Sequence, residues 1–272
     1  MPTTYSPLRY PGGKTKLYST IQPLILQSIA TECIYVEPFA GGAGLALKLL
    51  FCHDVDELIL NDIDENIYLF WHECLYNTEP LCQRVYDTTP SIEEWERQRK
   101  IFQQAGSYSS LDRAYATLFL NRCNVSGVIS GGPIGGKAQN GKYTISARYN
   151  RDGLVRKIQA IGAVANRIRL YCMDAQAFLT NVCPSLPIDR TILNIDPPYV
   201  NKGPLLYRNS FTDEDHIRLG EVIMGLHLKW IVTYDKCDLI QRIYKDYIRN
   251  TIFLKYSAGT PKDGQELLIT NL

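Results

Sequence analysis

The residues best suited to do chemistry in this sequence are Asp196-Pro197-Pro198-Tyr199, which directly follow the apolar run at residues 191–195. The apolar run predicts a buried strand, which the two prolines end. The four residues then lie at the carboxyl end of a strand, where open α/β sheets bind their ligands. A carboxylate, a rigid backbone carbonyl and a flat ring suit the binding of an exocyclic amine of a nucleic-acid base. Four such residues alone also fit an acidic turn, so the interpretation depends on the other segments.

A second segment of interest is the loop Glu37-Pro-Phe-Ala-Gly-Gly-Ala-Gly44, which joins a predicted strand to a predicted helix. Glycines let the backbone approach a ligand closely, and a helix amino terminus presents unpaired N–H groups. The dinucleotide fingerprint does not fit, because it would need a glycine at Ala43 or at Leu47. Asp62 ends the next predicted strand, where an acid accepts hydrogen bonds from ribose hydroxyls. The loop and Asp62 together favour a cofactor that contains a nucleoside.

Two further glycine-containing segments come close to an ATP-binding P-loop, and each fails at a defined position. The segment at residues 9–15 is preceded by Leu8, at the position where the motif requires its first glycine. The segment at residues 131–138 has Ala138 in place of the hydroxyl that binds Mg²⁺, and Pro133 removes an amide donor. Neither segment follows a predicted strand. The sequence therefore argues against ATP hydrolysis.

Charge is distributed unevenly along a chain whose net charge is +1. Residues 37–96 contain thirteen acids and two bases, whereas residues 121–170 contain nine bases and one acid. A basic block of this kind fits either a solvated face or a surface that faces phosphates. Within it, Arg122 suits the edge of a guanine and Asn124 the edge of an adenine. A phosphate contact, or the closing of a helix dipole, explains Arg122 equally well.

The segments that carry this chemistry must be positioned by a sheet with helices on both faces. The predicted fold class is therefore α/β, with a doubly wound, Rossmann-like sheet. We expect strands at 34–37, 58–60, 168–172, 191–195, 230–234 and 266–270, and helices at 44–52, 154–164, 175–180 and 213–228. Thr212 is the expected N-cap of the last of these helices.

The alternation of strands and helices stops between residues 66 and 152. Ser91-x-x-Glu94 predicts the start of a charged helix, and residues 111–122 predict a second one. Six glycines then fall within residues 127–142, ahead of a predicted strand at 143–146. We interpret residues 66–152 as an inserted helical domain that carries a glycine-rich β-hairpin. Residues 1–65 and 153–272 then form the main domain.

Composition limits the environment in which the chain is expected to work. The eight cysteines include no Cys-x-x-Cys pair and no zinc-finger spacing, so we expect no metal and a reduced compartment. No apolar run approaches the roughly 20 residues of a membrane span, and the amino terminus has no signal-like apolar region. A cytoplasmic protein is therefore expected.

The ordered set of motifs resembles the Dam-like, α-class site-specific DNA adenine-N6 methyltransferases. That family has an aromatic-x-Gly-Gly-Lys segment, a Glu-Pro-Phe-x-Gly-x-Gly-like loop, an acid ending the second strand, an inserted recognition domain with Asn-Arg, and Asp-Pro-Pro-Tyr. This sequence presents all of them in that order between residues 8 and 268. It departs from many relatives at Ser126, where they have Asn, and at residues 131–142. The order is far more specific than Asp-Pro-Pro-Tyr alone.

The resemblance implies S-adenosylmethionine as cofactor and double-stranded DNA as substrate, with a methyltransferase domain at residues 1–65 and 153–272 and a target-recognition domain at 66–152. The implied cofactor residues are Tyr10, Pro11, Gly12, Gly13, Lys14, Glu37, Phe39, Gly41, Asp62, Ile63, Asp174, Ala175 and Asp196. The catalytic residues are Asp196, Pro197, Pro198 and Tyr199, with Phe211 as a wall of the target-base pocket. Candidate DNA contacts are Arg122, Asn124, Ser126, Lys137, Gln139, Asn140, Lys142 and Arg148. Asp174 also fits a helix N-cap.

The reaction expected from this resemblance is direct methyl transfer to N6 of an adenine that has been flipped out of the duplex. Asp196 and the Pro197 carbonyl would accept the two N6–H bonds, and Tyr199 would stack on the base. No covalent intermediate is expected, because the Asp-Pro-Pro-Tyr loop contains no cysteine.

Three alternatives remain open at this point. They are an RNA guanine-N2 methyltransferase, a cytosine-N4 methyltransferase, in which Ser is common at the position of Asp196, and a non-catalytic regulator that binds the cofactor and nucleic acid. We expect a monomer or weak dimer. Any companion restriction endonuclease is expected to be a separate chain, because no nuclease-like segment is evident.

Overall fold

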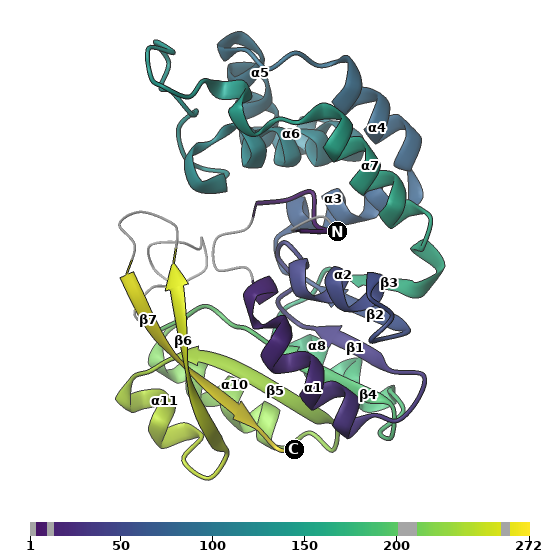
Figure 1. The fold of residues 1–272 in the computed structure, drawn as a ribbon, viewed down its shortest axis with the longest axis vertical. Helices are drawn as coiled ribbons and strands as arrows, with labels where there is room; N and C mark the ends of the chain where they lie inside the picture. The colour runs from purple at the N-terminus through teal and green to yellow at the C-terminus, as the bar shows by residue number, and fades with distance from the viewer. Residues whose placement is uncertain (1–3, 10–13, 201–210, 257–261) are drawn as a thin grey trace. The chain divides into compact units, whose positions relative to one another are not determined.

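A computed structural model of the chain describes residues 4–9, 14–200, 211–256 and 262–272, and it contains a seven-stranded sheet (Figure 1). The order of the strands across the sheet is β3-β2-β1-β4-β5-β7-β6. Their bounds are β1 Ile34–Glu37, β2 Glu57–Asn61, β3 Ile168–Tyr171, β4 Thr191–Ile195, β5 Lys229–Asp235, β6 Ile248–Tyr256 and β7 Lys262–Thr270. The fold is therefore mixed α/β, as predicted, and all six predicted strands of the main domain are present.

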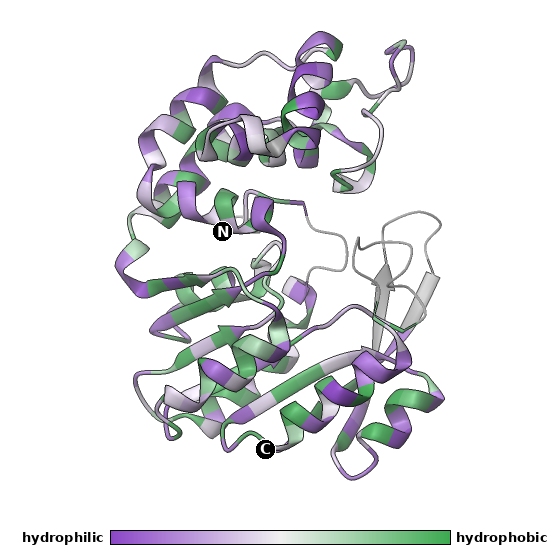
Figure 2. Ribbon diagram, turned by 180° about the vertical axis from the view of Figure 1, so that it is seen from behind, coloured by the Kyte–Doolittle hydropathy of each residue, from purple (hydrophilic) through white to green (hydrophobic). Residues whose placement is uncertain are grey.

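The order of the strands creates a switch point between β1 and β4. β1 pairs in parallel with β2 on one side and with β4 on the other, and β4 pairs in parallel with β5. β7 then inserts antiparallel between β5 and β6. β1 and β4 are buried along their full length, and Figure 2 colours the central strands mostly hydrophobic. Because chain connections leave in opposite directions from β1 and β4, the carboxyl ends of these strands flank the place where open sheets bind ligands.

Short helices connect the strands, and two of them, α8 and α10, begin at a side-chain N-cap. The helices of this part are α1 Tyr18–Ser28, α2 Gly44–Phe51, α8 Ala175–Asn181, α10 Asp213–Met224 and α11 Asp238–Ile243. Thr212 forms the predicted N-cap of α10, and Asp215 completes a capping box with it. Asp174 caps α8 by accepting hydrogen bonds from the Gln176 and Ala177 amides. The Asp174 side chain therefore does occupy an N-cap position.

The middle of the chain is helical. Its helices are α3 Glu65–Tyr76, α4 Thr78–Asp87, α5 Ile92–Gln103, α6 Ser110–Cys123 and α7 Arg151–Gly162. Ser91 caps α5, as the Ser91-x-x-Glu94 pattern predicts. α6 packs against α3 and α5, and its aromatic residues Tyr115 and Phe119 are fully buried. The helix is buried on most sides, which explains why its sequence shows little amphipathic pattern.

The glycine-rich β-hairpin predicted within the middle section is not formed, and residues 143–146 are not a strand. Residues 124–150 contain two short 3₁₀ turns, Val125–Gly127 and Ile145–Arg148, and a single bridge between Asn124 and Pro133. Positive φ angles at Ser126, Gly127, Gly135, Gly136 and Gln139 reverse the chain every few residues, which prevents an extended ladder. The segment is a compact loop, and the hairpin prediction was wrong.

Backbone packing divides the chain into two compact units. One comprises Lys14–Ala40, Leu45–Ile63 and Met173–Leu272, and the other comprises Met1–Gly13, Gly41–Gly44 and Asp64–Cys172. We call them the sheet unit and the helical unit. The helical unit is longer than the predicted 66–152 insert, and the assignment of 66–152 to target recognition stays a prediction. No helix in the described part of the chain is long and apolar enough to cross a membrane.

Candidate active site

The side chain of Asp196 lies immediately after β4, with its carboxylate held from two sides. Lys14 Nζ lies 3.1 Å from Asp196 Oδ1, and Thr233 Oγ1 donates a hydrogen bond of 2.9 Å to the same oxygen. Thr233 belongs to β5, whose residue Val232 is paired with Ile195 of β4, so the parallel register brings the two side chains together. Burial raises the pKa of Asp196 and the nearby Glu266 raises it further, whereas the positive charge of Lys14 opposes both effects.

Lys14 is the centre of the polar contacts around Asp196. Its Nζ donates to the Tyr199 hydroxyl at 2.5 Å and to Glu266 Oε1 at 3.4 Å, and it lies 4.7 Å from the centre of the Tyr199 ring. Lys14 is only 7% exposed and Glu266 is fully buried. Glu266 was not predicted as a site residue, because an acid within an apolar strand gives no local signal of the lysine that it faces.

Tyr199 is fixed by residues of β5 as well as by Lys14. Its ring lies 6.2 Å from that of Tyr234, with an angle of 35° between the planes. The neighbouring Val200 amide donates to Asp235 Oδ1 at 3.1 Å. Sequence reasoning treated β5 only as a structural strand and therefore missed Thr233, Tyr234 and Asp235. Their positions follow from the pairing of β5 with β4, which the sequence does not display.

Phe211, the predicted wall of the base pocket, lies in an aromatic group at the start of α10. Its ring is 6.1 Å from the Phe39 ring in an edge-to-face arrangement and 5.3 Å from the His216 ring. His216 Nδ1 lies 2.8 Å from the Tyr234 hydroxyl, and the His216 side chain is buried. The structure thus brings Phe211 together with Phe39, two residues that were predicted for different ligands.

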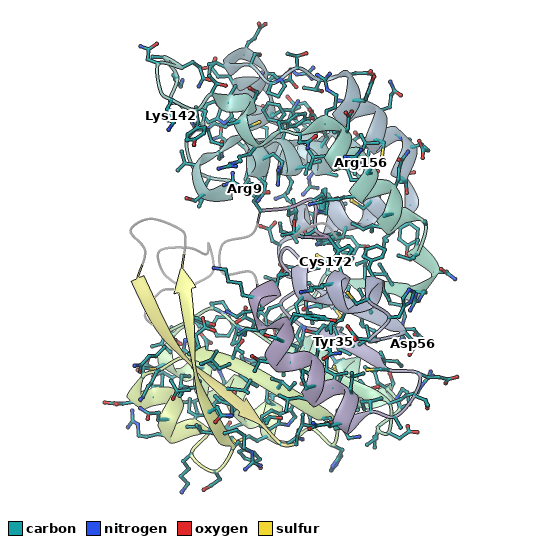
Figure 3. The ribbon with its side chains drawn as sticks, viewed as in Figure 1. Arg9, Tyr35, Asp56, Lys142, Arg156 and Cys172 are labelled. Atoms are coloured by element: carbon teal, nitrogen blue, oxygen red, sulfur yellow. The ribbon has the colours of Figure 1, made fainter. Side chains whose placement is uncertain are left out.

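Glu37 ends β1 on the other side of the switch point from Asp196. Its side chain is 6% exposed and accepts a hydrogen bond of 3.1 Å from the hydroxyl of Tyr35, which Figure 3 labels in the sheet. Burial raises the pKa of Glu37 to about 8, with a further contribution from the negative charge of Asp196. The Tyr35 hydroxyl and the Ala46 amide oppose this rise by donating hydrogen bonds to Glu37. The charge of Asp196 therefore favours the protonated form of Glu37 at the edge of the sheet.

The remaining cofactor candidates lie at the ends of neighbouring strands. Asp62 follows β2 and is half-buried, Ile63 beside it is 51% exposed, and Ala175 is buried in the first turn of α8. Asp174 Oδ1 accepts both hydrogen bonds from the backbone amides at the start of α8, at 3.0 and 3.1 Å. Tyr10, Pro11, Gly12 and Gly13 lie outside the described residues. Gly41, in the helical unit, has a φ of 46° and accepts a 2.9 Å hydrogen bond from the Trp71 indole.

Four basic side chains influence one another in the helical unit. The pKa of Arg122 is lowered to about 10, chiefly by burial and also by the positive charges of Arg9 and Arg148. Arg122 Nε donates to the Arg148 carbonyl at 2.7 Å, and Lys157 Nζ donates to the Ser6 carbonyl at 3.1 Å. The pKa of Lys157 is lowered by burial and by Arg122. Among the described residues, no carboxylate forms an ion pair with these four cations. Figure 3 labels Arg9 on this unit.

The side chains of two predicted DNA contacts use their hydrogen-bonding groups mainly within the loop that contains them. Asn124 is fully buried, accepts from the Trp95 indole at 2.6 Å, and donates to the Val128 and Ile129 carbonyls. Gln139 donates to the Ile134 and Gly136 carbonyls and accepts from the Ile145 amide. Neither amide has an edge left for a base, so the expectation of base contacts from them is not supported.

The other predicted DNA contacts are accessible. Ser126 is half-buried, with a φ of 57°, and Lys137 lies 2.8 Å from Glu96 in an exposed ion pair. Asn140, Lys142 and Arg148 are exposed, and Figure 3 labels Lys142 at the loop. An exposed pair such as Lys137 with Glu96 contributes little stability, so this lysine remains available to a charged ligand.

The chain is similar in sequence to known DNA methyltransferases. The family of D12 class N6 adenine-specific DNA methyltransferases matches residues 10–257. Type II methyltransferase M.MjaIII of Methanocaldococcus jannaschii is 22% identical, and the match covers 97% of this chain and 98% of that protein. Modification methylase StsI of Streptococcus sanguinis is 32% identical over 90 residues, which are 33% of this chain and 12% of that protein.

Among solved structures, the rRNA methyltransferase aviRa from Streptomyces viridochromogenes aligns with a TM-score of 0.40 and 14% identity, covering 96% of this chain and 86% of that one. The family match covers most of the chain and confirms the resemblance drawn from the motifs. The chain therefore belongs to the D12 class of N6 adenine-specific DNA methyltransferases.

Proposed function

We propose that this enzyme methylates an adenine flipped out of duplex DNA, at the carboxyl edge of the sheet beside the β1–β4 switch point. The observation that carries the proposal is the environment of the Asp196 carboxylate. Lys14 and Thr233 both contact Oδ1, whereas Oδ2 takes no hydrogen bond from the described residues. The side chain keeps 23% of its surface exposed. A partly exposed carboxylate that is held through one oxygen supports a role as an acceptor for an amine.

The chemistry requires such an acceptor because the N6 lone pair is delocalised into the purine ring. In this proposal Asp196 Oδ2 and the Pro197 carbonyl accept the two N6–H bonds and direct the nitrogen lone pair outward. Positive charge develops on this nitrogen during transfer, so fixed acceptors stabilise the transition state more than the ground state. Lys14 supports the ionised form of Asp196, because its charge opposes the rise in pKa caused by burial. Pro197 and Pro198 restrict the backbone that carries the carbonyl.

Tyr199 and Phe211 are the proposed walls of the base pocket. Stacking on an aromatic side chain contributes about 1–3 kcal/mol per base in proteins that bind single strands. The Tyr199 ring is held by Lys14 at its hydroxyl and by Tyr234 beside it. Phe211 is supported by His216, which is itself bonded to Tyr234. Both walls therefore depend on β5, which explains why this strand matters for the site.

The acids at this edge fit a cofactor that carries positive charge. Glu37 is a buried carboxyl with a pKa of about 8, which a cation placed beside it would lower. S-adenosylmethionine would supply a methyl group activated by positively charged sulfur. The half-buried Asp62 suits ribose hydroxyls, and Asp174 keeps Oδ2 for an adenine amine while its Oδ1 caps α8. The other residues proposed to hold the cofactor are Tyr10, Pro11, Gly12, Gly13, Lys14, Phe39, Gly41, Ile63, Ala175 and Asp196.

Duplex DNA is the proposed ligand of the helical unit, with residues 66–152 as the recognition domain. The four mutually repelling cations Arg9, Arg122, Arg148 and Lys157 support binding of the phosphate backbone, which would relieve their repulsion. The exposed contacts that remain from the predicted set are Lys137, Asn140, Lys142 and Arg148, with the half-buried Ser126 beside them. Arg122 is then a phosphate contact, since its Nε is already bonded to a carbonyl.

The proposal is tested by incubating the protein with methyl-labelled S-adenosylmethionine and duplex DNA, followed by digestion to nucleosides. The expected product is labelled N6-methyladenine, and parallel reactions with single-stranded DNA and RNA measure the preference for a duplex. Asp196→Ala should abolish transfer and retain measurable cofactor binding. If Asp196→Ala loses the cofactor together with activity, Asp196 is primarily a cofactor or structural residue and the proposed role is wrong.

A further inference from the structure

Asn61 is a buried polar residue at the end of β2 to which no ligand has been assigned. Its side chain is 1% exposed, and it immediately precedes Asp62, a proposed cofactor residue. A buried primary amide is costly unless its donors and acceptor are paired, so its partners show what it does.

The Asn61 side chain pairs with two loops that follow other strands. Its Nδ2 donates to the Pro38 carbonyl at 3.0 Å and to the Met173 carbonyl at 3.1 Å. Its Oδ1 accepts from the Met173 amide at 3.0 Å, so the side chain exchanges two hydrogen bonds with one residue, as paired strands do. The Asn61 carbonyl accepts a fourth bond, of 2.9 Å, from the Ala40 amide.

These four bonds join the segments that carry the proposed cofactor residues. Pro38 and Ala40 flank Phe39 in the loop that follows Glu37, the last residue of β1. Met173 directly precedes Asp174, the N-cap of α8. Asp62 is the next residue along from Asn61 itself. All these residues belong to the sheet unit, and Asn61 bonds to the backbone of both other loops.

We propose that Asn61 is a positioning residue that fixes the three loops of the cofactor site relative to one another without touching the cofactor. This inference rests on the proposed function, because it takes Phe39, Asp62 and Asp174 as cofactor residues. Only a primary amide offers two donors and an acceptor in one plane at this length. An aspartate has the same shape, but it would place a charged oxygen against the Pro38 and Met173 carbonyls.

The experiment uses the full chain and its Asn61→Asp and Asn61→Gln variants. Isothermal titration with S-adenosylmethionine and S-adenosylhomocysteine measures the Kd of each. Asn61→Asp should weaken both ligands at least tenfold, which corresponds to about 1.4 kcal/mol. Because the loops bind but do not react, KM for the methyl donor should rise more than kcat falls. Asn61→Gln keeps the amide but displaces it by one methylene, and an intermediate Kd is expected.

Asn124→Ala is the matched control. Asn124 is equally buried and makes three side-chain hydrogen bonds, but these lie in the helical unit. This variant should lose stability while its cofactor Kd stays within twofold of wild type. If Asn124→Ala weakens the cofactor as much as Asn61→Asp does, general destabilisation explains both and the positioning role is refuted. A wild-type Kd in folded Asn61→Asp would refute it as well.

Amide hydrogen exchange of the ligand-free protein separates this inference from the proposed function. The Met173 amide should exchange slowly in the wild type and at least tenfold faster in Asn61→Gln, because its acceptor is Asn61 Oδ1. A second result is that the wild type fails to bind S-adenosylmethionine while Asn61→Gln still shows faster exchange at Met173. That pair of results would contradict the proposed function and would still support the connection between the loops. Unchanged exchange would show that Asn61 does not hold the loop, whatever the ligand.

Discussion

Thr233→Val tests the proposed role of Asp196 without touching the reacting groups. Thr233 is fully buried on β5, and its hydroxyl donates to Asp196 Oδ1 at 2.9 Å. Valine has nearly the same shape as threonine, so the substitution removes one donor and leaves the strand packing in place. Lys14 still contacts the same oxygen, at 3.1 Å. The carboxylate therefore keeps its ion pair but loses one of the two contacts that orient it.

The size of the effect follows from the charge on the acceptor. A hydrogen bond to a charged group contributes about 1.5–3 kcal/mol, which corresponds to roughly 10- to 150-fold if it is lost in the transition state. The Thr233 hydroxyl also lowers the pKa of Asp196, since it stabilises the carboxylate. Its removal raises that pKa further. Because protonation of the carboxyl weakens Asp196 as an acceptor of its N6–H bond, activity on the acid side should disappear at a higher pH than in the wild type.

The assay is the initial rate of N6-methyladenine formation in duplex DNA, measured across pH for the wild type, Thr233→Val and Thr233→Ser. We expect kcat/KM of Thr233→Val to fall at least tenfold and its acid limb to move upward in pH. Thr233→Ser keeps the hydroxyl and should recover most of the rate. Cofactor Kd should change much less than kcat/KM in both variants. Wild-type kcat/KM and an unshifted acid limb in folded Thr233→Val would refute the reasoning.

Three further predictions concern charge and backbone geometry. The pKa of Glu37 is raised in the folded state from an ordinary 4.5 to about 8, so the wild type should lose stability as pH rises through this window. Glu37→Gln removes this dependence, so at pH 9 its free energy of unfolding should exceed that of the wild type by several kcal/mol, at about 1.4 kcal/mol for each unit of pKa shift. Urea unfolding of both proteins at pH 5 and pH 9 measures the difference. Arg148→Ala should weaken DNA binding and reduce the salt slope of the binding constant by about 0.9 if Arg148 contacts one phosphate, which a titration over several salt concentrations measures. An unchanged slope would exclude that contact. Gly127→Ala should destabilise the helical unit, because φ is +78° there and a Cβ would lie 2.2 Å from the Arg9 carbonyl oxygen. Thermal unfolding checks this, and a wild-type melting temperature would contradict it.

The parts of this protein that could be predicted from sequence are those in which local pattern and function coincide. The runs at residues 34–37 and 191–195 are short and mostly apolar, and both form strands that are buried along their length. The N-caps Thr212 and Ser91 could be predicted because each side chain accepts a hydrogen bond from a backbone amide only three residues further along the chain. The identity of the family followed from the order of such local motifs, and the match over residues 10–257 confirmed it.

The errors and omissions arise where distant segments meet. Glu266, Thr233 and Asn61 are ordinary residues of strands when read along the chain, and only the order of the strands brings them to the edge of the sheet.

The hairpin prediction failed because the glycines were interpreted as the turn between two paired strands. In the structure Gln139 satisfies the backbone groups of Ile134, Gly136 and Ile145, and the loop needs no ladder. A side chain that replaces a strand partner leaves no periodic signal in the sequence.

Lys14 shows how strongly the proposed chemistry depends on these long-range contacts. A carboxyl that is shielded from water tends to take up a proton unless a positive charge lies beside it. Lys14 contacts both Asp196 and Glu266, and its Nζ also bonds to the Tyr199 hydroxyl. Removing Glu266 would leave Lys14 paired with Asp196, whereas removing Lys14 would leave two buried acids facing each other. Loss of Lys14 should therefore raise the pKa of Asp196 and weaken the site more than loss of Glu266 does. Lys14 supplies a positive charge that opposes burial and like charge at Oδ1, whereas Thr233 supplies a neutral hydrogen bond to the same oxygen.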